Sequence, residues 1–160
     1  NRVVICAGRF QQQTTQQRPR VMLNTPYRDT WFMPARNSYM VRLLEDAGAR
    51  YVFEENTATQ TLPIDIEQAY YLTSKSDFWL NVSGCNTLDE VRRQNPRLAD
   101  TPPVREGRVY DNNRRRNAAG GSDFWESGVL RPDRVLADLV HIFHPELSET
   151  DELYYYRQLE

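Results

Sequence analysis

The sequence predicts an α/β fold in which a mostly parallel sheet lies between two layers of helices, a three-layer sandwich. Three observations support this prediction. Short apolar runs bounded by turn residues recur along the chain. Segments whose apolar residues have helical spacing separate these runs, and several of these segments begin at a residue that caps helices. Strands that alternate with helices in this way indicate βαβ units, which build parallel sheets covered on both faces.

Four segments have the composition of buried strands. Residues 20–24 form one short apolar run, and residues 51–53 form the second. Residues 78–82 form the third, and the segment 104–110 contains the last. Short apolar runs between turn residues are typical of strands that are buried on both faces.

Four helices are predicted between and after these strands. Asn37 or Ser38 caps the first, Asp65 caps the second, and Thr87 opens the third with a capping box. Pro132 lies in the first turn of the fourth helix, where proline is favoured. The residues expected to face inward include Leu43 and Leu44, then Ile66, Ala69 and Tyr70, and finally Leu136, Leu139 and Phe143.

The composition is that of an ordinary globular domain. The 160 residues carry a formal net charge of −2, which gives no overall attraction to nucleic acid or to an anionic membrane. The chain begins at Asn1 with no signal-like apolar core, so it is interpreted as a processed or truncated piece. Cys6 and Cys85 are the only cysteines, and either a disulfide between them or buried free thiols fits the sequence.

No common catalytic motif occurs in the sequence. The glycine-rich signatures of dinucleotide cradles and phosphate loops are missing, as is the Gly-x-Ser-x-Gly of hydrolases. With His141 and His144 as the only histidines, a metal site of the His/Cys type is poorly supplied. His144 is interpreted as a helix C-terminal cap. We therefore expect a binding module with no catalytic residues, no intrinsic cofactor and no metal site.

In parallel sheets, ligands meet the loops at the carboxyl ends of the strands. The loops after Asn24, Asn81 and Tyr110 are therefore the predicted binding rim. The last of these loops contains three consecutive arginines, two glycines and the adjacent rings of Phe124 and Trp125. This concentration of cations and aromatics in a loop indicates contact with another molecule.

Arg114 and Arg116 are predicted to contact carboxylates or catecholates of a ligand, while Phe124 and Trp125 cover its apolar part. The other interpretation of the arginines is a solvated cationic turn. Near the C-terminus, the three tyrosines 154–156 are expected to pack as a tail over the body of the domain.

Trp31 and Arg36 are further candidates for ligand contact. Residues 25–34 are predicted as a loop because prolines and polar residues interrupt them. Trp31, in this loop, either contacts a ligand or packs on the neighbouring helix. Arg36 either presents its guanidinium to an anionic ligand through bidentate hydrogen bonds or is solvated.

Together these motifs resemble the C-terminal lobe of the periplasmic binding proteins that serve ABC importers of iron-siderophores, haem and cobalamin. The resemblance covers residues 18–147, which leaves residues 1–17 as a remnant of the linking segment and residues 148–160 as a C-terminal tail. The matching segments, in order, are residues 18–23, 31–40, 43–49, 63–67, 76–80, 104–110 and 144–146.

The resemblance implies a Rossmann-like lobe of a two-lobed protein that holds its ligand between the lobes. It implies an iron chelate, haem or cobalamin as the ligand, with an ABC permease and the missing N-terminal lobe of the same protein as partners. It also implies a periplasmic location or a lipid anchor outside the cytoplasmic membrane.

The resemblance also assigns roles to individual residues. Tyr39 lies in the segment that resembles the ligand-facing loop and first helix. Glu67 corresponds to the glutamate that docks on permease arginines, with Asp65 in place of the usual serine. Asp123-Phe124-Trp125-Glu126 resembles the Asp-Trp-Phe loop that contacts ligand in the cobalamin branch, with the order of the aromatics swapped.

Two rival functions stay open from the sequence. One is an α/β enzyme or metallochelatase that uses His144 or Glu106 on a tetrapyrrole or a small substrate. The other is an interaction domain whose arginine loop binds an acidic protein.

Overall fold

A five-stranded sheet forms the centre of the computed structural model, which describes residues 18–57 and 59–160. The strand order is β3-β1-β5-β6-β7. The first four strands in this order are parallel, and β7 pairs antiparallel with β6. This confirms the predicted mostly parallel sheet. The strands are β1 (Arg20–Leu23), β3 (Arg50–Tyr51), β5 (Phe78–Leu80), β6 (Val109–Asp111) and β7 (Arg157–Gln158).

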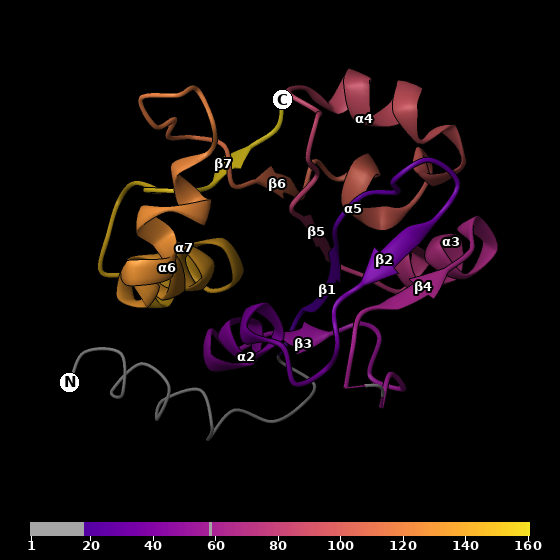
Figure 1. Cartoon of the computed structure of the whole chain (residues 1–160), viewed down its shortest axis with the longest axis horizontal. Helices are drawn as coiled ribbons and strands as arrows, with labels where there is room; N and C mark the ends of the chain where they lie inside the picture. The colour runs from indigo at the N-terminus through magenta and orange to yellow at the C-terminus, as the bar shows by residue number, and fades with distance from the viewer. Residues whose placement is uncertain (1–17, 58) are drawn as a thin grey trace.

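Helices cover both faces of this sheet, as Figure 1 shows, with α2 and α7 on one side and α3, α4 and α5 on the other. The domain is therefore the three-layer α/β structure that the sequence predicted. The helices are α2 (Tyr39–Asp46), α3 (Ile66–Ser74), α4 (Leu88–Gln94), α5 (Pro102–Arg105), α6 (Ser127–Leu130) and α7 (Pro132–Phe143). Short 3₁₀ turns occur at η2 (Pro96–Leu98), η3 (Asp123–Trp125) and η4 (Pro145–Leu147).

The helix starts follow the predicted caps. The Ser38 hydroxyl accepts a hydrogen bond from the Val41 amide at the start of α2. The Asp65 carboxylate accepts one from the Gln68 amide at 2.8 Å at the start of α3. At α4, the Thr87 hydroxyl accepts from the amide of the third helical residue. Each of these bonds satisfies an amide that has no partner within its own helix.

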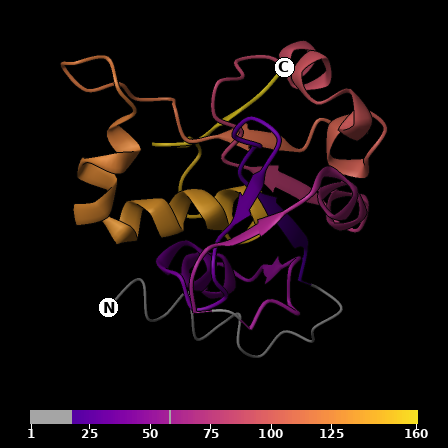
Figure 2. The same ribbon diagram turned by 45° about the vertical axis from the view of Figure 1, so that its right-hand side comes forward.

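Residues 25–34 are not entirely loop, which corrects the prediction for this segment. Trp31–Met33 forms β2, which pairs antiparallel with β4 (Leu62–Ile64). Trp31 and Met33 are buried while Phe32 is exposed, so the segment has the alternation of a strand with one buried face. Figure 2 shows this two-stranded sheet in front of the central one.

Two further details differ from the sequence expectation. The start of the segment 104–110 belongs to α5, because the prolines that precede it favour a helix N-terminus, and the strand begins only at Val109. In α3, Tyr70 points outward and is 41% exposed, while Leu72 and Thr73 are buried.

The C-terminal tail is part of the core. Tyr155 and Tyr156 are buried, and β7 follows them as the edge strand of the central sheet. The buried carboxylate of Asp138 in α7 accepts three backbone hydrogen bonds, from the amides of residues 154–156 at 2.6 to 3.0 Å. The expectation that the tyrosines pack on the domain is confirmed, and the tail also completes the sheet. The predicted linking segment, residues 1–17, lies outside the described residues.

Candidate ligand-binding site

Three asparagines come at or just after the carboxyl ends of β1, β5 and β6. Asn24 and Asn81 have positive φ angles of 72° and 63°, a left-handed conformation that asparagine tolerates better than most residues. Both are held in place: the Trp79 indole N–H donates to the Asn24 carbonyl, and the Tyr156 hydroxyl donates to Asn81 Oδ1 at 2.9 Å. Asn112 also donates to Asn81 Oδ1. The predicted rim is therefore a connected, ordered group of residues.

A cavity of about 210 Å³ lies over these strand ends, and we call it the polar cavity. Its lining is dominated by amide, hydroxyl and carboxyl groups, with two aromatic rings. The lining residues are Asn24, Thr25, Phe32, Asn81, Ser83, Asp111, Asn112 and Trp125.

A second cavity of about 190 Å³ shares three of these residues, and we call it the apolar cavity. Asn24, Asn81 and Trp125 line both, so the two cavities adjoin along the rim. The additional lining residues of the apolar cavity are Pro34, Tyr39, Met40, Phe124, Gly128, Val129 and Val135.

The structure brings together three of the predicted ligand-binding residues at the apolar cavity: Tyr39, Phe124 and Trp125. Phe124 is buried, and its ring packs edge-on against the rings of Trp125, Tyr155 and Tyr156. Trp125 is 65% exposed and Tyr39 is 53% exposed. Phe124 therefore anchors the loop in the core, and the other two rings face solvent beside the cavity.

Asp111 lies at the end of β6 and is only 3% exposed. One carboxyl oxygen, Oδ1, is buried and has no hydrogen-bond partner among the described residues. Desolvation raises the pKa of this carboxyl, while a hydrogen bond from the backbone amide of Asn112 and the positive charge of Arg157 lower it. Leaving a buried acceptor oxygen without a donor costs free energy. Because Asp111 also lines the polar cavity, it is a candidate for ligand contact.

Trp31 packs in the core, against residues of β1 and β5. It is 1% exposed, its indole N–H donates to the Leu23 carbonyl at 2.9 Å, and its ring lies 5.7 Å from that of Trp79. Arg36 is exposed and donates to the Glu54 carbonyl at 3.0 Å. Neither residue lines the polar or the apolar cavity.

The arginine loop does not turn toward the two cavities. Arg114 pairs with Glu152 at 3.7 Å, and Arg116 donates to the Gly120 carbonyl within its own turn. The guanidinium of Arg115 stacks 3.7 Å above the ring of Tyr154. None of the three arginines lines either cavity, so the prediction that Arg114 and Arg116 contact the ligand beside Trp125 gains no support from the structure.

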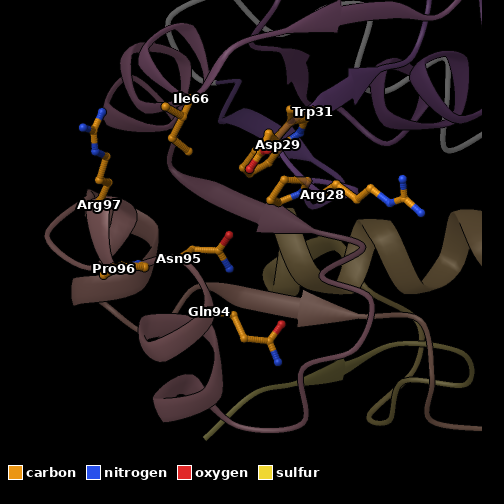
Figure 3. Close-up of a pocket in the computed structure, with 9 residues that line it drawn as sticks. Arg28, Asp29, Trp31, Ile66, Gln94, Asn95, Pro96 and Arg97 are labelled. Atoms are coloured by element: carbon orange, nitrogen blue, oxygen red, sulfur yellow. The ribbon is translucent and has the colours of Figure 1, made fainter.

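A third cavity, of about 340 Å³, is lined in part by residues of the loop after β1. Figure 3 shows it between the 26–29 turn, the start of α3 and the end of α4. Arg28, at the tip of the turn, has a positive φ of 56°. The Trp31 ring borders this cavity, while the guanidinium groups of Arg28 and Arg97 extend in different directions.

Glu67 lies beside this third cavity, in the first turn of α3. Its carboxylate accepts a hydrogen bond from Arg97 at 2.6 Å, and both side chains are largely exposed. The pair borders an open depression of about 420 Å³ that Tyr70 and Asp100 also line. Because Pro96 and Arg97 line both hollows, the depression adjoins the cavity of Figure 3.

The residues considered for catalysis lie apart from the cavities. His144 ends α7, as predicted, and its buried ring hydrogen-bonds the Gly48 carbonyl through Nε2 at 2.9 Å. Glu106 is exposed and pairs with Arg108 at 3.0 Å. In residues 18–57 and 59–160, no group of three or more His, Cys, Asp or Glu side chains is placed to hold a metal ion. Cys85 is a buried free thiol, which is one of the two interpretations considered for it, and Cys6 lies outside the described residues.

The sequence matches the periplasmic binding protein family over residues 2–114, so the chain belongs to this family. This membership confirms the predicted family and the predicted extracytoplasmic location. Among the described residues, no helix combines the length and the apolar character needed to cross a membrane.

One similar protein is an uncharacterized lipoprotein of Methanocaldococcus jannaschii, which is 27% identical over 131 residues. The match covers 80% of this chain and 30% of the lipoprotein. The chain therefore spans less than a third of the length of this relative.

Two solved structures share the fold. The TroA-like periplasmic binding protein FepB of Veillonella parvula has a TM-score of 0.65 at 14% identity, with 100% of this chain and 54% of that chain covered. The periplasmic heme-binding protein RhuT of Roseiflexus sp. RS-1, in its apo form, has a TM-score of 0.61 at 19% identity, with 89% and 51% covered. The chain thus spans about half of each.

Cavities lie at the loops that the sequence predicted as the rim, but the prediction named only some of the residues that line them. It used Asn24 and Asn81 only to mark strand ends, and Asp111 was passed over. A polar residue directly after a buried strand was the available signal, because in parallel sheets that position faces the ligand-binding edge.

Proposed function

We propose that the chain is the C-terminal lobe of a solute-binding protein that delivers an iron chelate (a siderophore or haem) or cobalamin to an ABC permease. Family membership, the similarity in fold to about half of two periplasmic binding proteins, and cavities at the carboxyl ends of the parallel strands all support this proposal. The fold similarity to a heme-binding protein is compatible with this ligand class.

The observation that carries the proposal is the convergence of exposed aromatic rings on the rim. Trp125 and Tyr39 both border the apolar cavity and both keep more than half of their surface exposed. Exposed aromatic rings that gather at a cavity are typical of a binding surface, and a macrocycle or chelate offers apolar surface that can cover them. We propose that these two rings and the edge of Phe124 contact the ligand.

The mechanism in this proposal involves no bond making or breaking. Ligand is captured between this lobe and an N-terminal lobe of the same protein, and closure of the two lobes covers the rings that stand exposed here. The cavities on this lobe are small and open, so it supplies one wall of the cleft.

We propose that Glu67 docks on an arginine of the permease. It lies at the surface, and its existing partner Arg97 is 61% exposed. Exposed ion pairs contribute about 0–1 kcal/mol, so a permease guanidinium can replace Arg97 at little cost. The depression next to the pair leaves room for a neighbouring side chain of the permease. Similarity to a lipoprotein supports a lipid anchor that keeps the parent protein close to this partner.

The test is a spectral titration of the full-length protein with haem, ferric siderophores and cobalamin. The proposal predicts saturable binding of one of these ligands at a stoichiometry of one per protein. Absence of binding to all of them, together with turnover of a small substrate, would sink it in favour of the enzyme hypothesis.

A further inference from the structure

Several hydrogen-bonding groups in the lining of the polar cavity have no partner among the described residues. The amide nitrogen of Asn24 donates to the Phe32 carbonyl at 3.0 Å, and that of Asn112 donates to Asn81 Oδ1 at 3.3 Å. Their amide oxygens accept no bond from any described residue, and neither does Asp111 Oδ1. The side-chain donors that remain in the lining are the amide nitrogen of Asn81, the hydroxyls of Thr25 and Ser83 and the indole N–H of Trp125.

The charge of the polar cavity favours a cationic ligand group. Its one ionisable lining residue is the nearly fully buried Asp111, and in the described part of the chain no lysine, arginine or histidine lines it. The nearest cation acting on Asp111 is Arg157, whose guanidinium is already bonded to Asn113 Oδ1 at 2.7 Å and to Asn86. The arginines of the 114–116 turn are engaged elsewhere, as described above.

Trp125 adds a surface suited to a cation. Its exposed indole lines both cavities and therefore belongs to both the polar and the apolar wall. The face of an indole attracts ammonium groups, and this attraction grows when the site is desolvated. A cationic donor at this position meets both the ring and the acceptor oxygens.

We infer that this wall of the cleft selects a metal chelate that presents a protonated amine, and disfavours one that presents carboxylates or catecholates. The inference rests on the proposed function and refines it by ligand charge. A protonated amine supplies up to three N–H donors, which match the unused oxygens of Asn24, Asp111 and Asn112. An anionic group would instead face a buried carboxyl with no basic side chain in the lining, which is unfavourable.

The experiment compares two ferric trihydroxamates that differ in one group. The ferric complex of desferrioxamine B has a pendant amine that is protonated at neutral pH, and acetylation of this amine removes the charge. Quenching of tryptophan fluorescence measures the affinity of the full-length protein for each. We expect the acetylated complex to bind about 10- to 100-fold more weakly, the range for loss of a charge-assisted hydrogen bond.

Asp111→Asn tests the assignment to this residue, and Glu126→Gln is its control. Asp111→Asn should remove most of the difference between the two complexes. Glu126→Gln makes the same charge change at an exposed residue next to Trp125 and should preserve the difference in affinity between the two complexes. Thermal melts of both variants report whether they fold.

Equal affinity of the wild-type protein for the two complexes would overturn the inference, and this comparison needs no variant. Tighter binding of a ferric tricatecholate than of either hydroxamate would overturn it as well. Binding of haem or cobalamin without binding of the amine-bearing complex would refute the inference and leave the proposed function standing. Failure to bind any of these ligands would refute the proposed function itself.

Discussion

Removal of the Asp138 carboxylate should destabilise the whole domain, because this one group anchors the C-terminal tail. Its two oxygens accept the amides of Tyr154, Tyr155 and Tyr156, at distances of 2.8, 2.6 and 3.0 Å. Asp138→Ala leaves the two fully buried amides, those of residues 155 and 156, without an acceptor. Each such loss costs about 1–3 kcal/mol, which gives about 2–6 kcal/mol in total.

Part of this cost is offset by relief of desolvation. Burial raises the pKa of Asp138 against the effect of the three amides, so the charged carboxylate itself is costly to bury. We therefore expect a net loss of about 3 kcal/mol in the free energy of unfolding, a large part of the usual 5–15 kcal/mol. Asp138→Asn keeps one acceptor oxygen, so its free energy of unfolding should lie between those of the wild type and the alanine variant.

Urea denaturation of the full-length protein, with hydrogen exchange of residues 154–156, measures this effect. Asp133→Asn is a suitable control, because it removes an exposed carboxylate from the same helix and should cost less than about 1 kcal/mol. An Asp138→Ala variant with a wild-type urea midpoint and unchanged exchange at Tyr155 and Tyr156 would refute the reasoning. Because the Tyr156 hydroxyl holds Asn81 on the rim, the variant should also bind ligand more weakly.

Three other predictions concern the rim and the surface. Trp125→Ala should weaken ligand binding about 10-fold or more in a fluorescence or spectral titration. It should barely change the melting temperature, because the ring is mostly exposed. Arg116→Ala is the control and should leave the affinity for ligand unchanged. Glu67→Ala should lower uptake in cells and leave ligand affinity intact; an equal loss of both would contradict the docking role. Affinity for an amine-bearing chelate should fall on acidification, at a pH above the ordinary carboxyl range. The reason is that the pKa of Asp111 is raised, so its carboxylate is protonated at a higher pH than an ordinary one. Asp111→Asn should flatten this pH profile.

The helix starts were predictable because their signals are local. Ser38, Asp65 and Thr87 each bond an amide three residues further along the chain, so the interaction is visible in the sequence itself. The parallel sheet followed from the alternation of strands and helices, and the rim followed from the geometry of parallel strands. These parts of the structure need no knowledge of distant contacts.

The elements that depend on distant contacts were missed or misjudged. The β2–β4 pair joins segments about thirty residues apart, as in Trp31 opposite Ile64, and its strands are only three residues long. Strand β7 depends on Asp138, which holds the tail in place from another helix. Hydrophobic patterns report which residues are buried, and they do not report which segments pair.

The arginine loop shows the same limit at the site. Its arginines and aromatic rings belong to one loop in the sequence, yet the structure separates them. Arg115 stacks on Tyr154 and Arg114 pairs with Glu152, both in the tail, while Trp125 lies at the cavities. Because the direction of each side chain depends on how the tail folds back, composition alone could not assign the arginines to the ligand.

A structure of the full-length protein bound to a ferric chelate tests the proposed function most directly. We predict that the chelate lies between two lobes, in van der Waals contact with the rings of Trp125 and Tyr39 over the carboxyl ends of β1, β5 and β6. A chelate bound away from this rim, with both rings still exposed to solvent, would contradict the proposal.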